Sequence, residues 1–180
     1  LVSEETNYSV KRITQISARE RGSCMENATF ILNGREITAE YEGRMTLLKY
    51  LRNVECMKGS KEGCSTGHCG ACTVLLDGKP VRSCVTRMDK LEGKSVVTIE
   101  ALHGADGGLH PIQQAFLDIG AVQCGFCTPG MVLATKALLD VNPDPTDEEI
   151  CEALKNNYCR CTGYVKICLL YTSDAADEAR

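Results

Sequence analysis

Eight of the twelve cysteines in this 180-residue chain fall into two closely spaced sets, which constrain the fold more than any other feature. Each set must be gathered by loops if it is to bind one metal centre, and such binding adds to the folding free energy. Large core side chains are few, with three Phe, six Tyr and no Trp, so inorganic cross-links would make up part of that deficit. The sets are Cys64, Cys69, Cys72 and Cys84, then Cys124, Cys127, Cys159 and Cys161.

The rest of the composition narrows the class of protein. The first 24 residues lack the apolar core of a secretory signal, so we expect a cytoplasmic location, where reductants keep ordinary disulfides open. Metal or cluster ligation is then the leading role for the thiols, and only three His leave any site dominated by thiolates. A net charge of −4 argues against a nucleic-acid surface, and no apolar run reaches the roughly 20 residues of a membrane span.

The first set has the spacing C-x4-C-x2-C…C, which is typical of plant-type 2Fe–2S clusters held by four thiolates, two for each iron. Gly63, Gly67 and Gly70 suit such a loop because they let backbone N–H groups approach the sulfurs. A zinc site made of four cysteines is the alternative, but zinc usually takes two similar C-x2-C pairs. We therefore predict a 2Fe–2S cluster on Cys64, Cys69, Cys72 and Cys84.

The second set consists of a C-x2-C pair before Thr128-Pro129 and a C-x-C pair before Thr162-Gly163, both predicted helix starts. Two helix N-termini facing each other would stabilise a dianionic cluster through their unpaired N–H groups. The C-x-C pair is too tight for a usual zinc knuckle, so zinc is again the second choice. We expect no ligand role, only small buried hydrophobes, at the remaining cysteines, Cys24, Cys56, Cys151 and Cys168.

Patterned segments predict an α+β domain over residues 25–102. Asn33-Gly34 and Asp77-Gly78 each lie between two runs of strand-forming residues, which indicates two tight hairpins. A further strand is expected at 95–99. Residues 46–54 are typical of a short amphipathic helix with Thr46 as N-cap.

A glycine-rich linker at 103–108 precedes a predicted helical bundle over residues 109–168. Its helices are expected to begin at Pro111, at Thr128, after the capping box of Thr146 and Glu149, and at Thr162. We interpret residues 1–24 as a disordered or non-native extension, and residues 169–180 as an artefactual or disordered tail.

Two stretches, KEGCSTGHCGACTVLLDGKPVRSC and VQCGFCTPGMVLAT with NNYCRCTGY, carry a family resemblance. They resemble the small iron–sulfur subunit of the molybdenum hydroxylases, the family of xanthine dehydrogenase, aldehyde oxidase and carbon monoxide dehydrogenase. The likeness covers about residues 27–166. It implies a β-grasp plant-type ferredoxin domain, followed by a four-helix bundle that holds a second 2Fe–2S cluster. It also implies a large molybdopterin-binding subunit and a medium FAD-binding subunit as partners.

The resemblance also assigns roles to single residues. It places the second cluster nearest the molybdenum cofactor and gives Gln123 a contact with the pterin, for which an amide offers both a donor and an acceptor. Without the resemblance, Gln123 is interpreted as a polar residue at a helix end. Ser65, Thr66 and His68 depart from the expected loop, so flavin-side contacts and the first cluster's potential could differ. We expect His68 to be exposed and not a ligand.

The function implied by the resemblance is an electron relay. Electrons leave the partner's molybdenum centre and pass singly through the second and then the first cluster to FAD or another acceptor. The chain then supplies no acid–base catalytic residue, and the substrate is a property of the large subunit. Two other classes stay open: a thiolate zinc-binding interaction module, and a stand-alone ferredoxin or redox sensor. Visible absorption tests the first alternative, and co-purification with a molybdopterin subunit tests the second.

Overall fold

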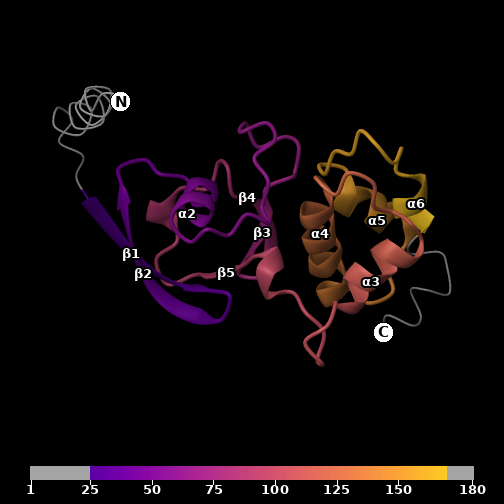
Figure 1. Ribbon diagram of the computed structural model, residues 1–180, viewed down its shortest axis with the longest axis horizontal. Helices are drawn as coiled ribbons and strands as arrows, with labels where there is room; N and C mark the ends of the chain where they lie inside the picture. Colours follow the sequence, from indigo (N-terminus) through magenta and orange to yellow (C-terminus); the bar gives the residue numbers. More distant parts are fainter. Residues whose placement is uncertain (1–24, 170–180) are drawn as a thin grey trace, which may run out of the picture.

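The computed structural model describes residues 25–169 of the chain. The expected extension 1–24, Cys24 within it, and the expected tail beyond Leu169 lie outside the described residues. Within residues 25–169, no helix is both long and apolar enough to cross a membrane. The described part is a mixed α/β protein with one small sheet followed by several helices (Figure 1).

The N-terminal half is built on one five-stranded sheet with the strand order β2-β1-β5-β3-β4. β1 and β5 run parallel, and the other neighbouring strands run antiparallel. Both predicted hairpins are present, and their turn residues take the positive φ angles of a tight two-residue turn, such as 52° at Asn33 and 80° at Gly34. The strands are β1 (Met25–Leu32), β2 (Arg35–Glu42), β3 (Thr73–Leu76), β4 (Lys79–Arg82) and β5 (Ser95–Val97).

The fifth strand is shorter than predicted because Ile99 opens a 3-10 turn, η2 (Ile99–Ala101). The predicted helix is α2 (Leu47–Asn53), whose apolar face is buried against the sheet with the help of η1 (Met88–Lys90). Thr46 occupies the N-cap position as predicted, but its side chain makes no capping hydrogen bond. Its backbone instead forms an isolated bridge with Arg87.

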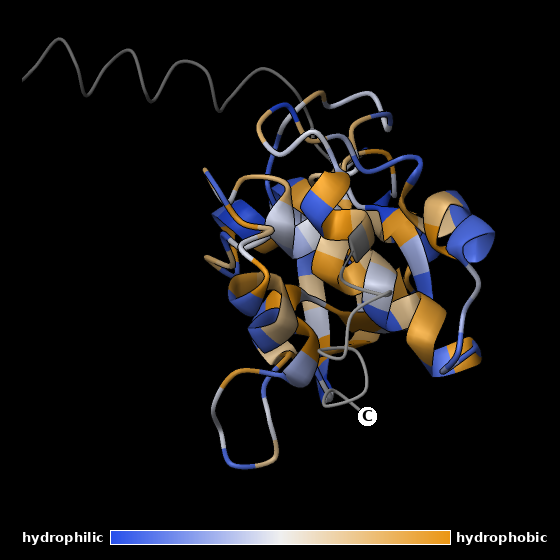
Figure 2. Ribbon diagram, turned by 90° about the vertical axis from the view of Figure 1, so that its right-hand side faces the viewer, coloured by the Kyte–Doolittle hydropathy of each residue, from blue (hydrophilic) through white to orange (hydrophobic). Residues whose placement is uncertain are grey.

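Four helices follow the sheet in the described residues: α3 (Pro111–Asp118), α4 (Thr128–Val141), α5 (Asp147–Leu154) and α6 (Val165–Leu169). Pro111 is the first residue of α3, and the Thr146–Glu149 capping box opens α5, both as predicted. The prediction for the last helix start is wrong by three residues, since α6 begins at Val165 and has only five residues. In Figure 2 the helices carry both hydrophobic and hydrophilic segments, as expected for helices that cover a core on one side.

Helix α4 connects the two halves of the molecule. It packs against β3 on one side and against α3 and α5 on the other (Figure 1). Leu75 of β3 and Leu133 and Ala137 of α4 form a buried apolar cluster between the sheet and the helices. The sheet and the helices therefore meet through a packed contact that can hold loops of the two halves in a fixed relation.

Candidate metal centres

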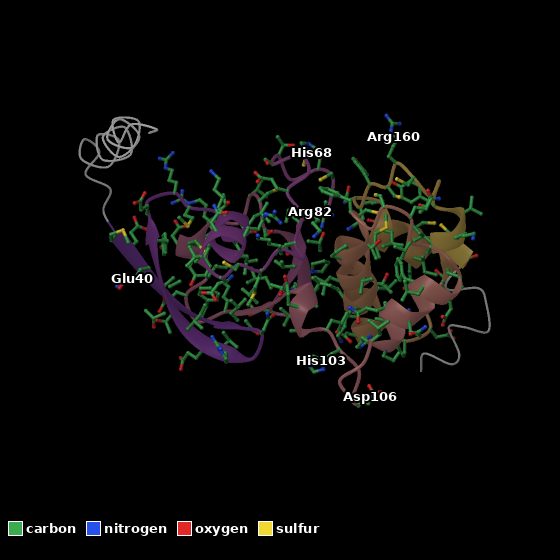
Figure 3. All side chains as sticks on the ribbon, in the orientation of Figure 1. Glu40, His68, Arg82, His103, Asp106 and Arg160 are labelled. Atoms are coloured by element: carbon green, nitrogen blue, oxygen red, sulfur yellow. The ribbon has the colours of Figure 1, made fainter. Side chains whose placement is uncertain are left out.

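Both cysteine sets lie on loops at the same edge of the molecule (Figure 1). In the first set, Cys64, Cys69 and Cys72 lie on the loop from α2 into β3, and Cys84 follows β4. In the second set, Cys124 and Cys127 lie just before α4, and Cys159 and Cys161 lie on the loop from α5 to α6. His68 and Arg160, one from each loop, both lie at this edge in Figure 3, whereas His103 and Asp106 lie at the opposite edge. The fold thus brings together two sets that are far apart in the sequence.

Hydrogen bonds prepare Cys64 in the first loop to act as a thiolate. Its sulfur accepts the backbone N–H of Thr66 and of Cys69, each at 3.4 Å. Bonds from the Thr66 hydroxyl and from these two N–H groups lower the pKa of Cys64 to about 5. The thiolate is the form that binds metals, so Cys64 is in its ligating state near neutral pH.

The sulfur of Cys69 in the first set packs closely against the backbone of Gly63. A Cβ added to Gly63 would lie only 2.8 Å from Cys69 Sγ, so a larger residue would displace a predicted ligand. Cys72 and Cys84 are buried neighbours, Cys72 before β3 and Cys84 after β4. Burial, together with a hydrogen bond to Cys72, raises the pKa of Cys84 to about 12, while the Gly67 N–H bonds to Cys84 and opposes this.

The second set gathers in the same pairwise manner. Cys161 Sγ lies 3.6 Å from Cys124 Sγ, and both residues are exposed. Cys127 is hydrogen-bonded to Cys159, and burial together with this bond raises the pKa of Cys127 to about 12. Cys127 is also the N-cap residue of α4, which begins at Thr128 as predicted.

The second predicted helix start has a different role from the one expected. Thr162 lies outside any helix and places its backbone N at 3.4 Å and its hydroxyl at 3.1 Å from Cys159 Sγ. Burial tends to raise the pKa of Cys159, but the Thr162 bonds, together with hydrogen bonds from Cys161 and Cys127, outweigh it and lower the pKa. The Tyr164 hydroxyl accepts the Cys159 N–H at 2.7 Å. A hydroxyl residue next to the C-x-C pair was the available signal for this role, but it was interpreted only as a helix start.

The other residues singled out in the sequence are Gln123, His68 and the cysteines outside the two sets, and those that the structure describes are all exposed. Gln123 is exposed beside Cys124, and His68 is exposed as predicted, with Nδ1 3.0 Å from Thr66 Oγ1. The expectation that the spare cysteines are buried is wrong for the described ones, since Cys56, Cys151 and Cys168 are all exposed. For Cys151 the reason is that Ile150 and Leu154 form the buried face of α5 and leave their neighbour outside.

One backbone hydrogen bond joins the two ligand loops directly. The Tyr158 N–H donates to the Cys69 carbonyl oxygen at 2.9 Å, and Tyr158 precedes Cys159 in the chain. A predicted ligand of the first set is therefore connected to a predicted ligand of the second through one peptide unit and one hydrogen bond. The sequence contains no local sign of this contact, because the two residues are far apart in the chain.

Comparisons with known proteins give two matching families and several close relatives. The family described as "2Fe-2S iron-sulfur cluster binding domain" matches residues 21–107, and that described as "[2Fe-2S] binding domain" matches residues 98–169. The chain is 50% identical over 136 residues to the nicotinate dehydrogenase small FeS subunit of Eubacterium barkeri, covering 76% of this chain and 86% of the relative. It is 49% identical over 136 residues to the nicotine 6-hydroxylase small subunit of Paenarthrobacter nicotinovorans, covering 76% and 81%. A solved structure of quinoline 2-oxidoreductase from Pseudomonas putida 86 superimposes with a TM-score of 0.80 at 40% identity, covering 86% of this chain and 95% of that chain.

Proposed function

Because this chain belongs to the family of small 2Fe–2S subunits of the molybdenum hydroxylases, we propose that it relays electrons from a molybdopterin centre to FAD or another acceptor. It is the iron–sulfur part of an oxidoreductase whose substrate is turned over in a large partner subunit. The observation that carries the relay is the meeting of both cysteine sets at one edge, joined by the Tyr158–Cys69 hydrogen bond.

The cysteine geometry fits two-iron clusters. The cysteine side chains interact in pairs, which suits a cluster whose two irons each take two thiolates. Such a cluster, when bound, takes up and releases one electron at a time. We assign the pairs Cys64 with Cys69, Cys72 with Cys84, Cys124 with Cys161 and Cys127 with Cys159.

The exposed edge of the second site is the side that we assign to the molybdopterin subunit. Gln123, Cys124 and Cys161 are exposed there, and Phe126 is 46% exposed although it is a large apolar side chain. Aromatic side chains are enriched where one protein covers another, which supports a partner on this side. In this assignment Gln123 offers its amide to the pterin, and the first site faces the FAD-binding medium subunit.

The arrangement of strands and helices supports the two domains that we assign to this chain. The parallel pairing of β1 with β5 beside two hairpins supports a β-grasp ferredoxin domain over residues 25–102. Helices α3 to α6 support a four-helix bundle domain over residues 109–168. The cytoplasmic location rests on the sequence alone and stays a prediction.

The test is purification of the native assembly through a tag on this chain. We expect a larger molybdopterin-containing subunit to co-purify, and the preparation to be red-brown because of the iron–sulfur absorption. A native monomer without a molybdopterin partner would contradict the relay. A colourless protein with stoichiometric zinc would contradict the clusters themselves.

A further inference from the structure

We propose that Asn157 is a positioning residue that sets the relation between the two clusters by tying the loop of the first site to the loop of the second. This inference rests on the proposed electron relay and concerns a side chain that is not a predicted ligand. Asn157 is 1% exposed and lies two residues before Cys159.

The contact between the two loops is made by backbone against backbone. Gly70 lies between Cys69 and Cys72 and has a φ of 72°. A Cβ on Gly70 would lie 2.4 Å from the Asn156 carbonyl oxygen and 2.9 Å from Asn157 Cα. The first loop therefore lies so close to residues 156–157 that only glycine, which has no Cβ, fits at position 70.

The Asn157 amide is the side chain at the centre of this contact. Its Nδ2 lies 3.2 Å from the Gly70 carbonyl oxygen and 3.4 Å from Thr73 Oγ1, more than 80 residues away in the sequence. Thr73 Oγ1 also donates to the Gly70 oxygen at 2.6 Å. The amide thus ties down the turn that carries Cys69 and Cys72 immediately before β3.

Two neighbouring hydrogen bonds extend the tie. Arg82 at the end of β4 donates from Nη2 to the Asn156 carbonyl oxygen at 3.1 Å and from Nη1 to Thr73 Oγ1 at 2.9 Å. The Tyr158 N–H donates to the Cys69 carbonyl oxygen at 2.9 Å. Residues 156–158 therefore make a continuous row of bonds to the first site, and of these three residues Asn157 alone has a buried side chain.

A role in folding alone explains this side chain poorly. Its amide oxygen is buried and has no hydrogen-bond partner among the described residues. The Gly70 oxygen would keep the Thr73 hydroxyl as a donor if Asn157 were removed. What the amide adds is orientation, because it fixes the loop before Cys159 relative to the turn after Cys69. Electron transfer between two clusters depends steeply on their separation, so this orientation bears directly on the relay.

The test compares Asn157→Ala with Asn156→Ala in the assembled holoenzyme. The Asn156 side chain is exposed, and the hydrogen bond to Arg82 uses its backbone carbonyl, so this control keeps the row intact. After full reduction with dithionite, we measure the EPR signals of the two clusters and the magnetic splitting between them. We expect Asn157→Ala to change the splitting and slow electron transfer between the clusters, at unchanged iron content. Asn156→Ala should match the natural chain.

Equal splitting and equal transfer rates in both variants would overturn the inference. If Asn157→Ala loses iron, Asn157→Ser decides instead, because it removes the amide donor to the Gly70 oxygen and leaves a smaller buried hole. A changed splitting at full iron content supports the inference, and an unchanged one overturns it. If the natural chain itself lacks two EPR signals, the proposed relay is contradicted. Failure of the relay can therefore be distinguished from failure of the Asn157 inference.

Discussion

Gly130, in the first turn of α4, is a position where the structure and helix propensity predict opposite effects of one methyl group. A Cβ on Gly130 would lie 2.2 Å from the Gly70 carbonyl oxygen and 3.2 Å from Asn157 Nδ2. The Gly70 oxygen is backbone and is held by Thr73 and Asn157, so it cannot rotate away. In Gly130→Ala, the helix and the loop of the first site must separate by about 1 Å to reach normal contact.

The magnitude follows from two opposing free energies. Replacing glycine by alanine inside a helix stabilises it by about 1 kcal/mol when nothing else changes. Overpacking a close contact costs about 1–3 kcal/mol, and the upper end applies here because the atom that must move is backbone. The net loss is then about 2 kcal/mol, which lowers the Tm of a protein of this size by roughly 4–8 °C.

The assay is thermal unfolding of the cluster-containing protein followed by circular dichroism at a fixed scan rate. Gly108→Ala is the matched control, because its φ needs no glycine and its near neighbour is the flexible Asp106 carboxylate at 3.1 Å. We expect the Tm of the control to change little, since substitutions at exposed positions usually stay within about 0.5 kcal/mol. An unchanged or raised Tm in Gly130→Ala would refute the close approach of α4 to the first site.

Three further changes test separate parts of the structure. Thr162→Val removes a hydroxyl 3.1 Å from Cys159 Sγ. Hydrogen bonds to cluster sulfurs favour the reduced state, so the reduction potential of the second cluster should fall by tens of millivolts in an EPR redox titration. For a one-electron couple, about 59 mV corresponds to a tenfold change in the equilibrium constant. Thr162→Ser keeps the hydroxyl and should keep the potential. His110 caps α3 by accepting the Ile112 N–H, and burial, with the charge of Lys136, lowers its pKa. The folded state then binds fewer protons than the unfolded one between that lowered pKa and about pH 6.5, so stability should fall as the pH drops through this window. His110→Asn, which caps without titrating, should flatten that part of the Tm–pH curve, and equal slopes would disprove the His110 contribution. Thr146→Ala removes the capping box of α5 and should cost about 1 kcal/mol by thermal unfolding, and a loss no larger than in Thr146→Ser would show that the cap contributes little.

Local signals in the sequence were enough to predict most elements of the fold. Asn33-Gly34 and Asp77-Gly78 turn as expected because asparagine, aspartate and glycine accept positive φ angles. Pro111 and the Thr146–Glu149 box begin helices because each satisfies, or does not need, the free N–H groups of a first turn. The shortened β5 and the late start of α6 are boundary errors, which depend on tertiary contacts.

The relation between the two halves could not be predicted in this way. Asn157 and Gly70 meet only because α4 packs against β3, and nothing in either local sequence indicates its partner. The role of the Thr162 hydroxyl was missed for a different reason, because its local signal, a threonine after the C-x-C pair, was interpreted as a helix start. Cysteine spacing indicated which thiols belong together, whereas the pairing of sulfurs within each set needed three-dimensional coordinates.

The most direct test of the two-cluster relay is EPR spectroscopy of the reduced holoenzyme with Cys127→Ser in this chain. We expect the natural chain to bind about four iron atoms and show two distinct signals, as two 2Fe–2S clusters require. Cys127→Ser should remove only the signal of the second cluster, while Cys151→Ser, which alters an exposed cysteine outside both sets, should keep both. Two unchanged signals in Cys127→Ser would contradict the assignment of the second site.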